Sequence, residues 1–182
     1  MWYKKLNIIM VGGIVGKTCL VNTYMAGSFV DTWTATEYDI KSIEMTMNGH
    51  RHTIQLYDTG AHDDIERLRQ MFYKQAHCFL LCYSINDRYS YENITEKWIP
   101  EIIAVKRVPI VLIATKLDLR NNLKTEVSSA EGEALKRKIN ANSFVECSAK
   151  QGINVELALE EAVRACYEGV PVLEKKDRCS IS

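Results

Sequence analysis

The sequence predicts a single α/β domain built on a six-stranded, mostly parallel sheet with helices on both faces. Short apolar runs typical of buried strands alternate with helical patterns from one end of the chain to the other. A glycine-rich turn directly follows the first of these runs. The length of 182 residues fits one domain with a core of ordinary size. We expect residues 1–170 to form that domain and residues 171–182 to form a mobile tail.

Six apolar runs are predicted to form the strands of this sheet. They cover residues 6–11, 40–47, 53–57, 78–84, 110–115 and 144–147. The Asn48-Gly49 pair separates the second run from the third, and this dipeptide is typical of a tight hairpin turn. Those two strands should therefore be antiparallel, whereas helical crossovers make the others parallel.

Helices are predicted where apolar residues recur with helical spacing. The first should begin at Lys17, the second near Tyr91 and the third near Ser128, where Ser128 and Glu131 form a capping box. Gly169 and Pro171 should end the last helix. Its inward face is expected to carry Val155, Leu159, Ala162, Val163 and Cys166.

Composition excludes several classes of protein. Lys plus Arg and Asp plus Glu both total 23, so the chain lacks the positive excess that nucleic-acid binding requires, and we expect no nucleic-acid partner. Its six cysteines lack the spacing of metal ligands, and no signal peptide is evident, which favours a reducing cytosol. No apolar run approaches the roughly 20 residues of a membrane-spanning helix.

The stretch Gly12-Gly13-Ile14-Val15-Gly16-Lys17-Thr18 has the chemistry of a phosphate-binding loop. A glycine-rich turn points backbone N–H groups into one concavity, the lysine adds a positive charge, and the threonine hydroxyl can ligate magnesium. The full motif requires a glycine five residues before Gly16, and this chain has Val11 at that position. Either a glycine has been replaced, or the loop has lost one residue and begins at Gly12. The second alignment keeps the strand in better register and is preferred.

Further polar motifs follow other predicted strands, where ligands of parallel sheets bind. Asp58 comes directly after the third strand, so its carboxylate can face a magnesium ion held by Thr18. The alternative is an aspartate that caps a surface turn. Thr36 lies in the segment 29–39, which has no strong pattern of its own and suits a loop ordered by ligand.

Two motifs after the fifth and sixth strands are suited to choosing a base. They are Thr115-Lys116-Leu117-Asp118 and Glu146-Cys147-Ser148-Ala149-Lys150. A carboxylate can accept two parallel hydrogen bonds from guanine N1–H and its exocyclic amine, which adenine does not offer. The alternative for each motif alone is an ordinary turn followed by a solvated lysine.

Together these motifs resemble those of the Ras-superfamily small GTPases, over residues 5–167. Within the superfamily the chain most resembles the Rho branch, through residues 16–20, 67–69, 97–101 and 115–120. One feature of that branch is missing, because residues 122–128 leave no room for the additional helix that Rho proteins usually carry there. A partner that uses this helix is therefore in doubt, and a Rab-like placement remains open.

The resemblance implies GTP or GDP and Mg²⁺ as cofactors. Lys17 would contact the outer phosphates, Thr18 and Thr36 would ligate the metal, and Asp58 would act through its water shell. Thr36, Lys17 and His62 would be the catalytic residues.

For the base, the resemblance implies that Phe29 packs on the guanine edge and Lys116 lies against its plane. Asp118 would read the base, and the Ala149 N–H would meet its carbonyl oxygen. Other residues expected around the nucleotide are Gly12, Gly13, Val15, Gly16, Cys19, Ala61, Thr115, Ser148 and Lys150. Residues 36–39 and 62–73 would be the switch segments, read by effectors, exchange factors and GTPase-activating proteins.

The chain departs from the family pattern at Gly60, Ala61 and His62, where alanine, glycine and glutamine are expected. Glutamine orients the attacking water in the template reaction of Ras, and histidine is shorter. We therefore expect retained nucleotide binding with slow intrinsic hydrolysis. The alternatives are a solvent-facing His62 without a role, and an interaction module without turnover or nucleotide. An adenine-directed kinase or ATPase is disfavoured by Asp118.

The last four residues, Cys179-Ser180-Ile181-Ser182, fit a prenylation box whose final serine favours farnesyl. A single lipid chain behind a weakly basic tail should give reversible binding at Cys179 to the cytoplasmic face of membranes. We expect a cytoplasmic monomer that visits these membranes.

Overall fold

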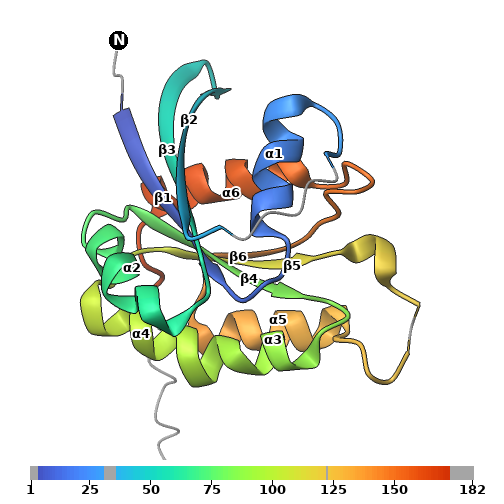
Figure 1. The fold of residues 1–182 in the computed structure, drawn as a ribbon. Helices are drawn as coiled ribbons and strands as arrows, with labels where there is room; N and C mark the ends of the chain where they lie inside the picture. Colours follow the sequence, from blue (N-terminus) through green and yellow to red (C-terminus); the bar gives the residue numbers. More distant parts are fainter. Residues whose placement is uncertain (1–3, 31–35, 122, 173–182) are drawn as a thin grey trace, which may run out of the picture.

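The computed structural model describes residues 4–30, 36–121 and 123–172 (Figure 1). Its six strands form one sheet in the order β2-β3-β1-β4-β5-β6. Only the β2–β3 pair is antiparallel, which confirms the predicted α/β class with a mostly parallel sheet. The strands are β1 (Lys4–Gly12), β2 (Tyr38–Met47), β3 (His50–Thr59), β4 (Cys78–Ser84), β5 (Ile110–Thr115) and β6 (Ser143–Glu146).

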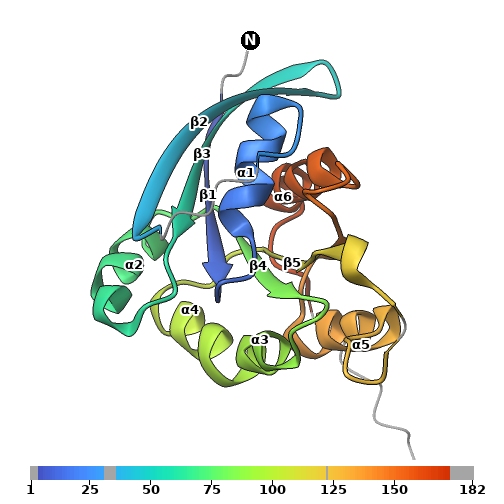
Figure 2. The ribbon, with the colours of Figure 1, turned by 45° about the vertical axis from the view of Figure 1, so that its right-hand side comes forward.

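Helices cover both faces of the sheet (Figure 2). α1 (Lys17–Ala26) and α6 (Val155–Glu168) pack on one face. The other face carries α2 (Glu66–Tyr73), α3 (Arg88–Asn93), α4 (Ile99–Val105) and α5 (Ser129–Ile139). The central strands lie between these layers, and every residue of β4 is buried. None of the helices in the described ranges is long and apolar enough to cross a bilayer.

The helix α2 was not predicted from the sequence. Only Arg69 and Tyr73 of its eight residues are buried. Leu68, Met71 and Phe72 recur with helical spacing, but they cover little more than one turn, which is too short a pattern to predict a helix. The helix predicted near Tyr91 in fact begins at Arg88, because the Asp87 side chain accepts the Ser90 N–H and caps it.

This second helix widens in its middle. The segment η2 (Ile94–Trp98) is a π turn, in which the Ile99 N–H reaches back to the Ile94 carbonyl, and it runs directly into α4. Pro100 follows at the start of α4 and has no N–H to offer residue 96. One α-helical hydrogen bond is therefore absent at this point, and the helix can adopt a wider π turn there at little further cost.

The loop before α5 is short and internally bonded. Within its described residues, 120, 121 and 123–128, no helix occurs. The buried Glu126 carboxylate accepts the N–H groups of Asn121 and Leu123, and Arg120 donates two hydrogen bonds to Glu146. The predicted capping box of Ser128 and Glu131 then starts α5. Hydrogen bonds to these carboxylates thus close the connection from β5 to α5.

Candidate functional site

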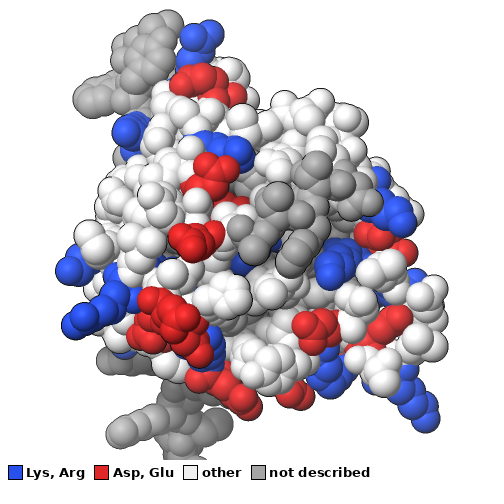
Figure 3. All heavy atoms as spheres, viewed as in Figure 1, with Lys and Arg blue, Asp and Glu red and all other residues white. Residues whose placement is uncertain are grey.

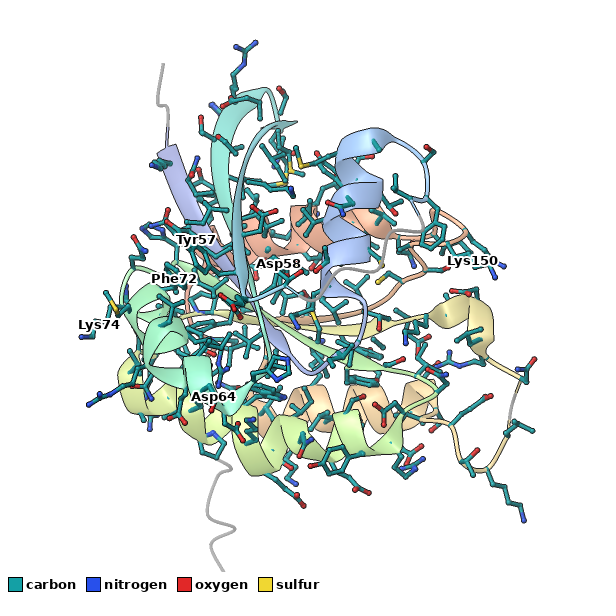
Figure 4. The ribbon with its side chains drawn as sticks, viewed as in Figure 1. Tyr57, Asp58, Asp64, Phe72, Lys74 and Lys150 are labelled. Carbon is teal, nitrogen blue, oxygen red and sulfur yellow. The ribbon has the colours of Figure 1, made fainter. Side chains whose placement is uncertain are left out.

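The predicted motifs meet at the carboxyl-terminal edge of the sheet, where they line two adjoining cavities. One cavity has a volume of about 210 Å³ and lies among the glycine-rich loop, Thr36 and residues 58–62. The other, of about 330 Å³, lies between that loop and the segments after β5 and β6. Val15, Gly16 and Cys19 line both. In Figure 4, Asp58 near the middle and Lys150 at the right mark the two ends of this site.

The backbone of the glycine-rich loop shows where the loop begins. Gly12 has φ +147°, and a Cβ there would lie 2.3 Å from the carbonyl oxygen of Cys82 in β4. Only glycine fits so close an approach. Val11 instead is a fully buried residue of β1, in register with Leu81. The loop therefore begins at Gly12 and is one residue shorter than the usual pattern, as in the alignment preferred from the sequence.

Lys17 holds a buried positive charge at the bottom of the smaller cavity. The residue is 6% exposed, and its Nζ donates to the carbonyl oxygens of Gly12 at 2.8 Å and Gly13 at 2.7 Å. Burial lowers the pKa of this ammonium group. No carboxylate of the described residues forms an ion pair with it. The site thus presents a desolvated cation, which a bound anion would stabilise.

The start of α1 adds to this preference for anions. Gly16 precedes the helix with φ +92°, a left-handed conformation that glycine adopts easily, and it has no side chain to cap the first turn. The first N–H groups of α1 therefore face the cavity with the positive end of the helix dipole. No acidic residue of the first turn of α1 neutralises that end.

Three oxygen-bearing side chains from separate elements converge beside Lys17. The hydroxyl oxygens of Thr18 and Thr36 lie 3.1 Å apart, and Thr18 also donates to Asp58 Oδ2. The second carboxylate oxygen, Asp58 Oδ1, is buried and accepts no hydrogen bond from any described residue. Burial raises the pKa of Asp58. Hydroxyl and carboxylate oxygens are the donors that Mg²⁺ prefers, and the unpaired oxygen fits a hydrated ion of this kind.

The larger cavity is lined by the segments predicted to choose a base. Asp118 accepts a hydrogen bond of 2.5 Å from the Ser148 hydroxyl, which in turn accepts the Gln151 N–H. Lys116 has φ +60°, and its side chain lines the same cavity. Phe29, Cys19, Ala149 and Lys150 complete the predicted residues around it. Ser148 is fully buried and lines neither cavity, so its observed role is to hold the Asp118 carboxylate.

Thr115 connects the two halves of the site. Its hydroxyl donates to the carbonyl oxygen of Val15 at 2.6 Å and lies 3.1 Å from the carbonyl oxygen of Tyr83. The side chain is buried, so water does not compete for these bonds. The glycine-rich loop is therefore fixed to the end of β5, next to the larger cavity.

The residues that depart from the family pattern lie at the rim of the smaller cavity. The Gly60 N–H donates to the Glu37 carbonyl oxygen at 2.8 Å, and a Cβ at this glycine would lie 2.3 Å from the Thr36 carbonyl oxygen. Ala61 and His62 line the cavity directly after it. Gly60 thus binds the first predicted switch segment just before the second begins at the exposed His62.

Arg69 supports this rim, a role that was not predicted from the sequence. Its Nη1 donates to the carbonyl oxygens of Gly60 and His62, at 3.2 and 2.5 Å. Its Nε and Nη2 form a two-pronged ion pair with Glu101 of α4, which also accepts the Tyr73 hydroxyl. These residues stood only within segments quoted for the family resemblance, and their pairing between α2 and α4 could not be read from one sequence.

The structure therefore gathers the predicted nucleotide residues at one edge of the sheet. Cys179, the predicted lipidation site, and the rest of residues 173–182 lie outside the described residues. Among the described residues no group of three or more His, Cys, Asp or Glu side chains could hold a metal ion alone. The oxygen cluster of Thr18, Thr36 and Asp58 contains only one carboxylate and would need further oxygens from a ligand or water.

Comparison with known proteins finds relatives over nearly the whole chain. The sequence model of the Ras family matches residues 7–168. The Ras-like GTP-binding protein RhoL of Drosophila melanogaster is 41% identical over 181 residues, covering 98% of this chain and 95% of that protein. The Rho-related protein racC of Entamoeba histolytica is 33% identical over 188 residues, covering 97% of this chain and 96% of that protein.

The short loop yields a paired prediction. Gly12→Ala should destabilise the protein by more than about 2 kcal/mol, because the new methyl group would clash with the Cys82 carbonyl and strain the backbone. Gly13→Ala is the matched control, since a Cβ there meets only Val15 Cγ1 at 3.8 Å, and its unfolding should change little. Urea unfolding followed by fluorescence measures both. Equal midpoints for the two variants would contradict a loop that begins at Gly12.

Proposed function

The chain belongs to the Ras family as a Rho-like small GTPase, and from this premise we propose that it is a magnesium-dependent switch with slow intrinsic hydrolysis. The observation that carries the proposal is the buried Lys17 ammonium, which has no ion-pair partner among the described residues and lines the smaller cavity with the oxygen cluster. GDP and GTP supply the missing anion in their phosphates. Effectors and regulatory proteins would read residues 36–39 and 62–73.

In this proposal the two cavities hold the two ends of one nucleotide. The phosphates occupy the smaller cavity against Lys17 and the first turn of α1. Guanine occupies the larger cavity, where Asp118 accepts two hydrogen bonds from the base. The Ser148 hydroxyl holds that carboxylate in place, so little freedom is lost when the base binds.

The oxygen cluster supports the magnesium part of the proposal. Thr18 and Thr36 would ligate the ion with their hydroxyls, and the unpaired Asp58 Oδ1 would accept a hydrogen bond from a metal-bound water. When bound, Mg²⁺ neutralises charge that develops on the phosphates during transfer. Thr36 belongs to one switch segment, so its contact couples the state of the nucleotide to that segment.

The residues at the rim of the phosphate cavity support the proposal of slow hydrolysis. Catalysis of this reaction depends on an oriented water and on donors aimed at the terminal phosphate. His62 carries a shorter side chain than glutamine and has its two ring nitrogens on opposite sides. The Gly60 N–H is used by the Glu37 carbonyl, so at that position it is not aimed at a phosphate.

A second candidate is an interaction module that recruits partners without turnover. The shortened loop and the altered residues Ala61 and His62 favour it, because they remove or displace groups that act on the terminal phosphate. The two candidates differ in bound nucleotide and in turnover, which the next two experiments measure.

The nucleotide site is tested by protein purified with magnesium and then denatured, with the released nucleotide identified by chromatography. We expect nearly one guanine nucleotide per chain. Asp118→Asn should weaken GTP binding by roughly a hundredfold, since an amide places a donor against the donors of guanine. Glu133→Gln, an exposed carboxylate-to-amide change on α5, is the control and should bind normally. Parent protein that is empty and takes up no GTP would establish the interaction module instead.

The hydrolysis rate is tested by single-turnover assays on His62→Gln. Restoring the longer amide should raise the rate by about tenfold or more, because one side chain can then donate to and accept from the water. His62→Ala is the control and should be no faster than the parent. A parent rate equal to that of ordinary family members without a helper protein would contradict slow hydrolysis.

We further propose that Cys179 carries a lipid and holds the protein reversibly at the cytoplasmic face of membranes. Cys179→Ser should move the protein from the membrane fraction to the soluble fraction of cells, and mass spectrometry should show the loss of a prenyl group. Ser180→Ala retains the cysteine and the final serine, so it should behave like the parent. A Cys179→Ser variant that remained on membranes as fully as the parent would refute this assignment.

A further inference from the structure

The end of the described chain is fixed beside the carboxyl terminus of α5. Asn140 Nδ2 donates to the Pro171 carbonyl oxygen and Asn142 Nδ2 to the Gly169 carbonyl oxygen, both at 2.8 Å. Both asparagines lie in the connection between α5 and β6. The described chain therefore ends beside this connection.

Six positively charged residues precede the first residues of three adjacent strands at this same edge. They are Lys74 before β4, Lys106 and Arg107 before β5, and Lys136, Arg137 and Lys138 before β6. Because β4, β5 and β6 are parallel neighbours, their amino-terminal ends lie together. We call these six residues the basic end.

Hydrogen bonds connect the parts of the basic end. Lys106 Nζ donates to the Lys74 carbonyl oxygen at 3.0 Å, and the Asn142 N–H donates to the Ile110 carbonyl oxygen at 2.7 Å. The three connecting segments are therefore held against one another. In Figure 4, Lys74 projects at the left of the molecule, on the side opposite Lys150 and the base cavity.

No ion pair engages the basic end in residues 4–30, 36–121 and 123–172. Lys136, Arg137 and Lys138 form the last turn of α5, where the helix dipole favours positive charge. Glu133 and Glu168 are the acidic residues of α5 and α6 nearest to it in the sequence. The whole chain has no net charge, and positive and negative side chains are interspersed on the face shown in Figure 3. The basic end therefore differs from that face because all six of its named charges are positive.

We propose that the basic end docks on the anionic surface of a phospholipid membrane. Exposed Lys and Arg side chains gain about fivefold in binding for each charge near such a surface, and the gain needs no pocket. Charge complementarity and the position of Val172 at this edge, seven residues before Cys179, both favour a membrane as the occupant. An acidic protein surface would match the charge but has no connection with the proposed lipid site.

The position of Cys179 strengthens this choice and rests on the proposed lipidation. Cys179 comes seven residues after Val172, so the connecting chain spans at most about 25 Å. A lipid there would hold the basic end, rather than the nucleotide edge, toward the bilayer. Because the nucleotide cavities lie at the opposite ends of the strands, they would remain accessible to partners.

The test uses the full chain with Cys179→Ser, loaded with GDP, so that no lipid contributes. Flotation with vesicles of phosphatidylcholine alone is compared with vesicles that also contain phosphatidylserine. Arg137→Gln combined with Lys138→Gln should weaken binding to the anionic vesicles by roughly tenfold or more. Arg51→Gln combined with Lys124→Gln removes the same charge from exposed positions elsewhere and should change binding by less than about twofold.

Two results would overturn the proposal. Equal losses in both double variants would mean that net charge alone decides, and a parent chain that ignores phosphatidylserine would mean that this end has another partner. Bound GDP is measured in every sample, so a failure of the nucleotide site is distinguished from a failure of the basic end. Urea unfolding of the double variants confirms that both remain folded.

Discussion

The Lys17 ammonium is buried, and two backbone carbonyl oxygens are the acceptors that hold it in place. Removing this charge from water costs free energy, which the hydrogen bonds to the two carbonyl oxygens partly offset. The neighbouring residues hold the loop that carries those carbonyl groups. Gly12 brings its carbonyl within reach because it has no Cβ, and it can do so only by lying against the Cys82 carbonyl of β4. The buried Thr115 hydroxyl fixes the same loop to β5. The central strands thus set the position of the charge, and the charge sets the kind of ligand that the edge can accept.

Much of this could be predicted from the sequence, because the signals are local. Strands buried on both faces appear as short apolar runs, and the polar motifs directly follow them, so the meeting of these motifs at one edge of the sheet could be inferred from the sequence. The sequence also favoured a loop that begins at Gly12, and the close approach of Gly12 to a residue of β4 gives the physical reason. The helix α2 could not be predicted, because the contacts that bury it are not local. Its buried residues are Arg69 and Tyr73, whose burial depends on Glu101 far away in the sequence.

The rim of the phosphate cavity combines altered chemistry with a firm support. Ala61 and His62 replace the expected residues, yet the carbonyl oxygens on either side of Ala61 are held by Arg69, whose own charge is paired with Glu101. A buried bidentate ion pair of this kind fixes the relative positions of its two side chains more than it raises the free energy of unfolding. The segment is therefore not simply a loosened version of the family loop. It presents different side chains from a backbone that the helices α2 and α4 hold in one place.

The π turn at Ile94–Trp98 has a consequence for that support. A π turn takes up one more residue than an α turn, so each residue after it is rotated by about 100° around the axis relative to an uninterrupted α-helix. Glu101 follows the turn by three positions and depends on that rotation to face α2. The phase of α4, which lies on the same face of the sheet as α2, thus determines whether the arginine beneath the cavity rim has a counterion. A single-residue deletion within the turn would act on the nucleotide edge without touching it.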